Sequence, residues 1–279
     1  MLIVKEISKL EALIQKEKKE GKKIGLVPTM GALHEGHLSL VKKAGEETDY
    51  VVVSIFVNPT QFNDLNDLEK YPRKEDQDLK LLEKTSCNIV FTPEVKTMYP
   101  EPDTRNFDFG KLGEVMEGAF RTGHFNGVAQ IVSRLFSIVK PDVAFFGMKD
   151  FQQIAIIRSM VKQLKLPVEI VSCPVIRDND GLAKSSRNER LTKEQRENAP
   201  WIYHVLKEAQ SKVQTMTVPE LKDWVVSEIN KNSGLKTQYF EVVDSETLMP
   251  VENWNKTKDR TGCVAVFCGD IRLIDDITL

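Results

Sequence analysis

The sequence predicts an α/β fold in which a doubly wound parallel sheet, Rossmann-like and N-terminal, is followed by a smaller α+β domain. Strand-like and helix-like segments alternate along the first part of the chain, which is typical of parallel strands joined by right-handed crossovers. The run "YVVVSIFVN" at 50–58 is apolar on consecutive positions, as in a strand that is covered on both faces. Near residue 177 this alternation stops, so we expect two domains, 1–176 and 177–279.

The first half of the N-terminal domain alternates helices with strands. Ser8 followed by Glu11 is a capping-box pattern, so we expect a first helix that ends near Gly21. The strand "KKIGLVP", the helix "LSLVKKAGEE" and the strand at 50–58 come next. The segment "RKEDQDLKLLEK" is interpreted as a helix with a solvated charged face rather than an interaction tail, and the strand "NIVFTP" follows it.

The second half of this domain begins with a stretch, 98–127, that is rich in Gly, Pro and turn residues. After it come the helix "VAQIVSRLFSIVK", the strand "DVAFFG", the helix "DFQQIAIIRSMVKQLK" and the strand "VEIVSCPVI". Counted from "KKIGLVP", a strand order of 3-2-1-4-5 would make the first and fourth strands neighbours at the point where the winding reverses. Their carboxyl ends would then open the crevice in which such sheets bind ligands.

The C-terminal domain is expected to start at the polar loop "RDNDGLAKSSRN". A long helical region begins at Thr192, and Pro200 inside it is expected to kink a helix or to start one. Another helix begins near Pro219, and the strands "TQYFEVVD" and "CVAVFCGDIRLI" close the chain. Because no helical pattern separates these strands, some antiparallel pairing is expected.

Charge and cysteine content exclude several classes of function. The 279 residues carry 39 basic and 41 acidic side chains, so no global positive field draws the protein onto nucleic acid. The N-terminus has neither a signal peptide nor a spanning helix, so we expect a soluble, cytoplasmic protein that does not bind membranes. The four cysteines form no Cys-x-x-Cys pair and are expected to be reduced and structural.

The stretch "PTMGALHEGH" at 28–37 follows the first strand and holds two of the four histidines, His34 and His37. Gly36 allows the backbone to approach a ligand, and the amides at the start of the next helix offer donors and a partial positive charge. These features are typical of a phosphate site. The two histidines could instead be plain loop residues or half of a metal site, but the sequence shows no obvious third ligand nearby.

Three other segments would lie near the same crevice. The motif "GMKD" at 147–150 follows the fourth strand, and "NPTQF" at 58–62 ends the second strand, where Gln61 can donate and accept as a hydroxy-acid substrate requires. The loop "AKSSRN" combines a cation, hydroxyl groups and an arginine, which suits a loop that closes over a nucleotide. Singly, each segment is also typical of an ordinary turn or cap.

A few single residues are less informative. Gln153 lies in the first turn of a helix, and Arg121 is a possible anion partner. Arg158, in mid-helix, is more typical of a surface or ion-pair residue. His204 is interpreted as structural, and His124, in a Gly-rich turn, fits either a structural or a functional role.

Five motifs carry a resemblance to a known family. "PTMGALHEGH", "VNPTQF", "RTGHFNGV", "FFGMKDFQQ" and "DGLAKSSRN" occur in an order and spacing that resemble the pantothenate synthetase (pantoate–β-alanine ligase) family of the HxGH nucleotidyltransferase superfamily. One H-x-G-H is a weak signal, but five motifs in register over nearly the whole chain are specific. The resemblance implies ATP-dependent condensation of (R)-pantoate with β-alanine to pantothenate, AMP and diphosphate through a pantoyl-adenylate, with Mg²⁺ and as a homodimer.

The resemblance also implies roles for individual residues. The domain 1–176 would bind nucleotide and pantoate, and 177–279 would form a lid. His34, His37, Lys149 and Arg187 would be catalytic, and no protein ligand for a metal is implied. Pantoate and β-alanine would contact Gln61, Gln153, Asn58, Arg121 and Tyr71. ATP would be held by Met30, Gly31, Ala32, Leu33, His34, Glu35, Gly36, His37, Gly147, Met148, Lys149, Asp150, Ile176, Lys184, Ser185, Ser186 and Arg187.

One position departs from the family pattern, and two other functions compete with the ligase. The family usually has Met or Leu where this chain has Lys184. The nearest rival is an H-x-G-H adenylyl- or cytidylyltransferase that leaves the nucleotide on its product. The second is a nucleotide-binding regulator without turnover. Transfer RNA is not expected as a partner, because the charge is nearly balanced and no basic appendage is present.

Overall fold

A computed structural model describes residues 1–279, and the chain divides into two compact units. Unit 1 comprises Met1–Phe109, Arg121–Gly147 and Ile156–Pro174. Unit 2 comprises Gly110–Phe120, Met148–Ala155 and Val175–Leu279. The last division lies close to the predicted boundary at residue 176, but two earlier segments also belong to unit 2. A separate function for each domain remains a prediction.

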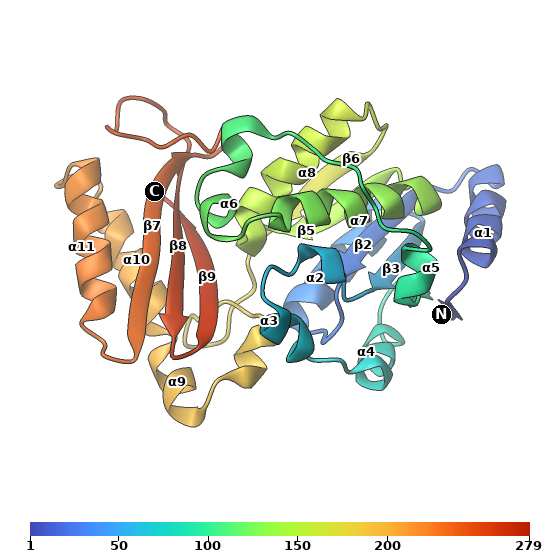
Figure 1. Ribbon diagram of the computed structural model, residues 1–279, viewed down its shortest axis with the longest axis horizontal. Helices are drawn as coiled ribbons and strands as arrows, with labels where there is room; N and C mark the ends of the chain where they lie inside the picture. The colour runs from blue at the N-terminus through green and yellow to red at the C-terminus, as the bar shows by residue number, and fades with distance from the viewer. The chain divides into compact units, whose positions relative to one another are not determined.

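Unit 1 is built on a six-stranded parallel sheet in the order β1-β4-β3-β2-β5-β6. Figure 1 labels β2, β3, β5 and β6 of this sheet. For the five strands that the sequence predicts, this is the expected 3-2-1-4-5 order, and the α/β fold class is confirmed. An edge strand, β1, was not predicted. The strands are β1 (Leu2–Val4), β2 (Ile24–Thr29), β3 (Tyr50–Ile55), β4 (Cys87–Phe91), β5 (Val143–Gly147) and β6 (Glu169–Cys173).

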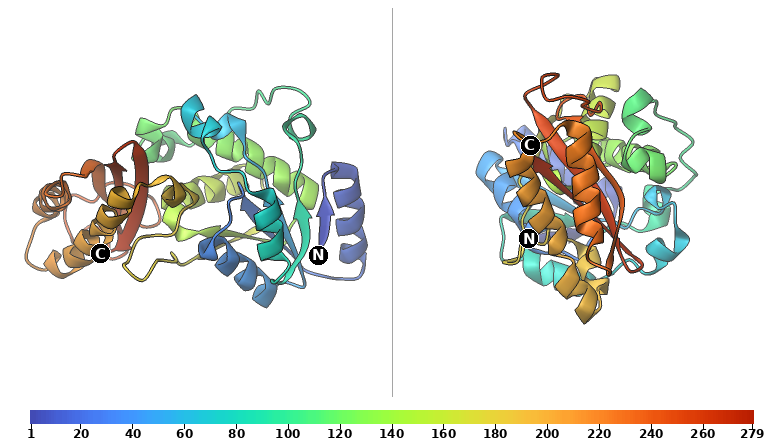
Figure 2. Two further views of the ribbon diagram at one scale, coloured as in Figure 1. Left: turned by 90° about the horizontal axis from the view of Figure 1, so that it is seen from below. Right: turned by 90° about the vertical axis from the view of Figure 1, so that its left-hand side faces the viewer.

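Helices cover both faces of this sheet, as a doubly wound fold requires. The helices α2 (Glu35–Glu47) and α7 (His124–Val139) lie on opposite faces (Figure 2). Side chains of α2 and of α4 (Glu75–Leu82) pack against Val27, Val53 and Phe145 of the central strands. On the other face α7 contacts α1 (Ile7–Lys19). The connections also contain two short helices, α3 (Leu65–Glu69) and α5 (Val95–Met98), and the 3₁₀ turn η1 (Pro59–Gln61). Helix α8 (Phe151–Gln163) begins in a segment that belongs to unit 2.

Unit 2 is built on a three-stranded antiparallel sheet in the order β7-β8-β9. Its strands are β7 (Leu235–Asp244), β8 (Arg260–Cys268) and β9 (Ile271–Thr278). Side chains of α10 (Trp201–Lys212) and α11 (Val218–Asn230) form one core with this sheet. The unit also holds α6 (Glu117–Phe120), α9 (Lys193–Asn198), and the 3₁₀ turns η2 (Gly110–Gly113), η3 (Met148–Asp150) and η4 (Ser186–Arg190).

Several local predictions can be compared directly with the structure. The capping box predicted at Ser8 was wrong, because α1 is preceded by Glu6 and has no side-chain cap. The segment "CVAVFCGDIRLI" forms two strands rather than one, because the chain turns at Gly269, whose φ is +60°. Pro200 directly precedes α10, so it starts a helix. All four cysteines are free and buried, as expected. None of the helices combines the length and the apolar composition needed to cross a membrane.

Candidate active site

The histidine stretch forms the connection between β2 and α2. Its first half is tied to the neighbouring strand by Thr29, whose hydroxyl donates to the carbonyl oxygen of Ser54 (2.7 Å) and accepts from the amide of Gly31 (3.2 Å). Gly31 and Ala32 both have left-handed backbone angles, with φ of +80° and +49°. A non-glycine residue in this region is uncommon and is held there only by its surroundings.

Asp78 of α4 holds the backbone of this loop in place. Its two carboxylate oxygens accept the amide N–H groups of Ala32 (2.8 Å) and Leu33 (2.7 Å), and the residue is only 1% exposed. Sequence reasoning missed Asp78, because it treated the whole segment "RKEDQDLKLLEK" as a solvated face. We therefore expect Ala32 and Leu33 to shape the loop rather than to donate their amides to a phosphate.

The two histidines cap the first turn of α2. The amide of Gly36 donates to Nδ1 of His34 (3.1 Å), and the amide of His34 donates to Nδ1 of His37 (3.3 Å). Contrary to the expectation from sequence, these two amides are already occupied by side chains. Because Nδ1 accepts a hydrogen bond in both rings, each neutral imidazole carries its proton on Nε2. The ring centroids are 4.1 Å apart, so the loop holds two rings close together, each with its N–H at Nε2.

The predicted substrate residues Asn58 and Gln61 lie together at η1, which follows β3. Asn58 is 1% exposed, and its Nδ2 donates to Oε1 of Gln61 (3.1 Å). The Gln61 Nε2 in turn donates to the sulfur of Met30 in the histidine loop (3.1 Å). The structure therefore brings Met30, Asn58 and Gln61 into one cluster. Because Asn58 is buried and engaged inside the protein, it is better suited to orient Gln61 than to contact a ligand.

Arg121 and Tyr71 are placed near the same turn. Nη1 of Arg121 lies 3.0 Å from Nε2 of His124, and Nδ1 of His124 lies 2.8 Å from the backbone oxygen of Gln61. Because arginine can only donate, Nε2 accepts and Nδ1 donates. His124 thus has a structural role in holding η1. Tyr71 is 5% exposed and packs edge-on against Phe62.

Several other predicted nucleotide ligands, from Met148 to Asp150 and from Ile176 to Arg187, lie in unit 2. Lys149 of η3 pairs with Asp150 (3.6 Å). The hydroxyl of Ser185 caps η4 by accepting the amide of Arg187 (3.3 Å). Lys184, the position at which we expected a departure from the family pattern, forms an ion pair with Asp178 (2.7 Å). This contact gives Lys184 a structural partner within its own unit.

A buried carboxylate pair on β9 was not predicted. Arg177 contacts both oxygens of Asp275, at 2.6 and 2.9 Å. Burial raises the pKa of Asp275, and burial together with the charge of Asp275 raises the pKa of Asp276 to about 7. The Oδ2 atom of Asp276 is buried without a hydrogen-bond partner. Nothing in the pattern "RLIDD" distinguishes these residues from an ordinary charged strand end.

The two glutamines at the start of α8 have different surroundings. Gln152 is buried, donates to the carbonyl oxygens of Leu112 and Val115, and accepts the amide of Glu117. It therefore holds the segment that carries η2 and α6. Gln153, the residue implied by the resemblance, is half-buried and outside this network.

Two residues set aside by sequence reasoning do have ordinary surroundings. Arg158 is exposed, and its Nη2 lies 3.3 Å from the hydroxyl of Ser172. His204 is exposed and stacks on Trp201, with ring centroids 4.8 Å apart. Neither contact calls for a role in binding or catalysis.

Comparison with known proteins identifies the family. A family model described as "Pantoate-beta-alanine ligase" matches residues 2–278 of the chain. The chain belongs to the pantoate-beta-alanine ligase family. A pantothenate synthetase from Bacteroides fragilis (strain YCH46) is 56% identical over 277 residues, which cover 99% of this chain and 98% of the relative. One from Porphyromonas gingivalis (strain W83) is 52% identical, with 99% of each chain covered.

Solved structures in this family share the fold. Pantothenate synthetase from Thermus thermophilus is 40% identical, with a TM-score of 0.93 and 99% of each chain covered. The ligase from Francisella tularensis, whose structure is described as complexed with beta-gamma ATP and beta-alanine, is 36% identical. Its TM-score is 0.85, with 100% of this chain and 97% of that chain covered. The family resemblance carried by the five motifs is confirmed.

The protein alone does not form a metal cage. No group of three or more His, Cys, Asp or Glu side chains is arranged to hold a metal ion. Mg²⁺ commonly keeps several waters and binds substrate phosphates with one or two carboxylates. A magnesium ion would therefore depend on the phosphates of a bound nucleotide for several of its ligands.

Proposed function

We propose that this chain joins (R)-pantoate to β-alanine at the expense of ATP and releases pantothenate, AMP and diphosphate. Family membership supports the ligase reaction, and the Francisella ligase in complex with β-alanine supports the second substrate. The observation that supports the proposal for this chain is the pair of histidines that cap the start of α2. His34 and His37 present two Nε2–H groups from the start of a helix, which is where a polyphosphate is stabilised.

The first step is proposed to be attack of the pantoate carboxylate on the α-phosphorus of ATP, which gives pantoyl-adenylate and diphosphate. A carboxylate is ionised at pH 7, so this attack requires no general base. The protein then has to align the reactants and stabilise the charge that develops on the departing diphosphate. We assign this stabilisation to the Nε2–H donors of His34 and His37, which are held in place before the reaction.

Gln61 is proposed to bind pantoate, because its side-chain amide lies against Met30 of the histidine loop. The N–H groups of an amide can donate to a carboxylate or hydroxyl oxygen, both of which a hydroxy acid offers. Gln153 is proposed as a second pantoate ligand, since its half-buried side chain stays outside the network that engages Gln152. We propose that Arg121 and Tyr71 shape this region.

The segments 147–150 and 176–187 are proposed to supply further nucleotide ligands. Lys149 and Arg187 are the cations that we assign to the phosphates, with the hydroxyl groups of Ser185 and Ser186 beside Arg187 in sequence. Other positions that we assign to ATP are Gly147, Met148, Asp150, Ile176 and Lys184 in these segments, and Met30, Gly31, Glu35 and Gly36 in the histidine loop. Mg²⁺ bound to the nucleotide would supply further charge neutralisation.

The second step is proposed to be attack of the β-alanine amine on the acyl-adenylate, which forms the amide bond and releases AMP. This attack requires a neutral amine, and the sequence motifs name no base for it. Substrate assistance by the AMP phosphate is consistent with this. A homodimeric assembly and a cytoplasmic location complete the proposal.

The reaction is tested by measuring AMP with pantoate, ATP and β-alanine supplied together and with each acid omitted. We expect AMP only when both acids are present. A nucleotide that stays on the product would instead support the rival nucleotidyltransferase, and binding of ATP without any pantoate-dependent turnover would support a regulator.

A further inference from the structure

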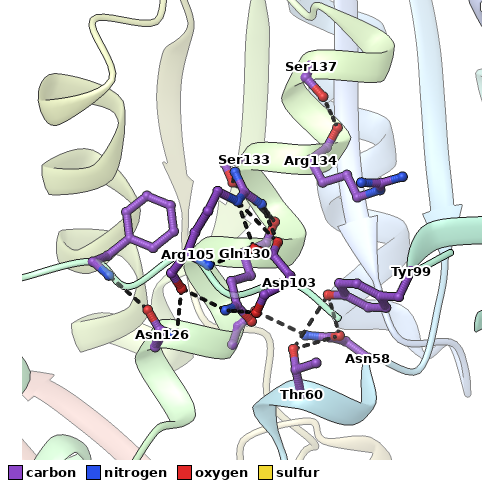
Figure 3. Close-up of polar contacts among 12 residues, drawn as sticks. Asn58, Thr60, Tyr99, Asp103, Arg105, Asn126, Gln130, Ser133, Arg134 and Ser137 are labelled. Carbon is purple, nitrogen blue, oxygen red and sulfur yellow. Dashed lines mark hydrogen bonds and ion pairs between the residues drawn. The ribbon is translucent and has the colours of Figure 1, made fainter. Parts of the chain in front are cut away.

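A chain of side-chain hydrogen bonds leads from Tyr99 to Gln61. The Tyr99 hydroxyl donates to Oδ1 of Asn58 (2.8 Å), and the Thr60 hydroxyl donates to the same atom (3.1 Å), as Figure 3 shows. Nδ2 of Asn58 donates to Oε1 of Gln61 (3.1 Å), and Nε2 of Gln61 donates to the sulfur of Met30 (3.1 Å). All of these residues belong to unit 1.

The donor and acceptor roles along this row of hydrogen bonds are fixed, because one of its acceptors is a backbone carbonyl oxygen. Nδ2 of Asn58 also donates to the backbone oxygen of Gly127 (3.1 Å), and a carbonyl oxygen only accepts. Turning the Asn58 amide over would therefore place two oxygens against each other in a buried site. With Asn58 fixed, Gln61 must receive its hydrogen bond on Oε1, and its nitrogen must point the other way, toward Met30.

The backbone of η1 is fixed as well. Nδ1 of His124 contacts the backbone oxygen of Gln61 at 2.8 Å. Helix α7 comes so close at Gly127 that a Cβ atom there would lie 2.3 Å from the backbone oxygen of Thr60. Movement of the Gln61 amide is thus limited to its own side-chain torsions, and the contact with Asn58 restrains these.

Tyr99 is well placed to hold Asn58. It follows α5, it is half-buried, and its ring lies against Phe56 with centroids 6.2 Å apart. Burial raises the pKa of its hydroxyl, so the group remains protonated and can donate at neutral pH. Tyr99 and Thr60 both donate to Oδ1 of Asn58, and the Tyr99 bond is the shorter of the two. Loss of the Tyr99 donor should therefore weaken the hold on Asn58, because hydrogen bonds in a connected network support one another.

We infer that Tyr99 is a positioning residue that, through Asn58, holds the Gln61 amide with its N–H groups toward the substrate, so that the site selects an oxygen acceptor such as a carboxylate or hydroxyl. A ligand that offers an amine in that place meets a donor and is disfavoured. This inference rests on the proposed binding of pantoate by Gln61. It adds two features to that proposal: a role for Tyr99, which lies outside the five motifs, and the orientation of the Gln61 side-chain amide.

The test removes one hydroxyl group. In Tyr99→Phe we expect the KM for pantoate to rise about fivefold, the change for one hydrogen bond of ordinary net strength. The KM for ATP should change by less than about twofold. Tyr50→Phe is the matched control, because Tyr50 is a buried tyrosine of β3 in the same unit; both constants should stay close to those of the parent protein.

A double-variant cycle separates positioning from general stability. If Tyr99 acts through Gln61, Tyr99→Phe should raise the KM for pantoate in the parent protein but not in a Gln61→Ala background. A purely structural role for Tyr99 predicts the same rise in both backgrounds. Melting temperatures of all variants, measured alongside, report any general loss of stability.

The outcomes are distinguishable. Equal effects of Tyr99→Phe in both backgrounds, or an effect no larger than that of Tyr50→Phe, would overturn the inference while leaving the ligase reaction in place. Absence of pantoate-dependent turnover in the parent protein would instead remove the proposed function, and the inference with it. A rise confined to the KM for pantoate and lost with Gln61 supports the inference.

Discussion

At the residue scale, the histidine loop depends on a buried acid that comes from a different helix. Asp78 accepts two consecutive amides of the loop, and Ala32, which donates one of them, has a left-handed backbone. The loop in turn places His34 and His37 at the start of α2. A carboxylate that binds backbone amides so close to a proposed phosphate site works by ordering the chain, since its charge would repel a phosphate.

Asp78→Asn replaces one of these acceptor oxygens with an NH₂ group that faces an N–H. We expect a loss of about 1 to 3 kcal/mol in the free energy of unfolding, typical of a buried group left without a partner. The KM for ATP should rise as the loop loosens. Urea unfolding and steady-state kinetics measure the two effects.

Asp64→Asn is the control for this change. Asp64 caps the short helix α3 at an exposed position, and asparagine caps a helix about as well as aspartate. We therefore expect little change in this variant. Equal behaviour of the two variants would show that Asp78 does not order the loop.

At the element scale, the close approach of α7 to η1 sets the position of Gln61. Gly127 allows this approach, because a Cβ atom there would lie 2.3 Å from the Thr60 oxygen and 2.7 Å from Cα of Gln61. Gly127→Ala is expected to push η1 away from the helix and to raise the KM for pantoate, with a stability loss of about 1 to 3 kcal/mol from overpacking.

Ser137→Ala, at an exposed position on the same helix, serves as its control. Both substitutions introduce alanine, which favours helices, so intrinsic propensity alone would stabilise both variants. If Gly127→Ala were as stable and as active as Ser137→Ala, α7 would not determine the position of Gln61.

The elements also show which features a sequence can predict. Long apolar runs flanked by turns identified β2 to β6, since a central strand such as β2 is buried almost throughout. The edge strand β1 has only three residues, and Leu2 and Ile3 are exposed, so it lacks that pattern. β8 and β9 were merged because only two residues separate them within one apolar run.

The candidate site likewise contains residues that the sequence predicts and residues that it does not. His34 and His37 were singled out by their unusual spacing, and Gln61 by its place at the end of the second predicted strand. Asp78 and Tyr99 act across the fold, on loops far away in sequence. Their local sequence resembles any charged helix or aromatic turn, so only the structure reveals their partners.

At the scale of the whole molecule, the buried Asp276 should make stability depend on pH. Its pKa rises from an ordinary 3.8 to about 7 in the folded chain, so the folded state binds more protons than the unfolded state between these values. Stability must then fall as pH rises from about 4 to about 7. The loss attributable to Asp276 is on the order of 3 kcal/mol.

Asp276→Asn should reduce this fall, because asparagine does not ionise. The comparison isolates Asp276, since Asp275 and Arg177 remain in both proteins. Urea unfolding at pH 5 and pH 8 measures the difference, and tryptophan fluorescence is a suitable probe because Trp201, Trp224 and Trp254 all lie in unit 2 with Asp276. An unchanged pH dependence in the variant would mean that Asp276 is ionised throughout this range.

The most direct test of the whole account is pantoate-dependent exchange of labelled diphosphate into ATP, measured without β-alanine. This exchange isolates adenylation, the step that we assign to the two histidines that cap α2. We predict exchange in the parent protein and in the control His204→Ala, whose ring only stacks on Trp201. In His37→Ala the rate should fall by about 10² or more, as for loss of one preorganised donor. Exchange at nearly the parent rate in folded His37→Ala would contradict the account.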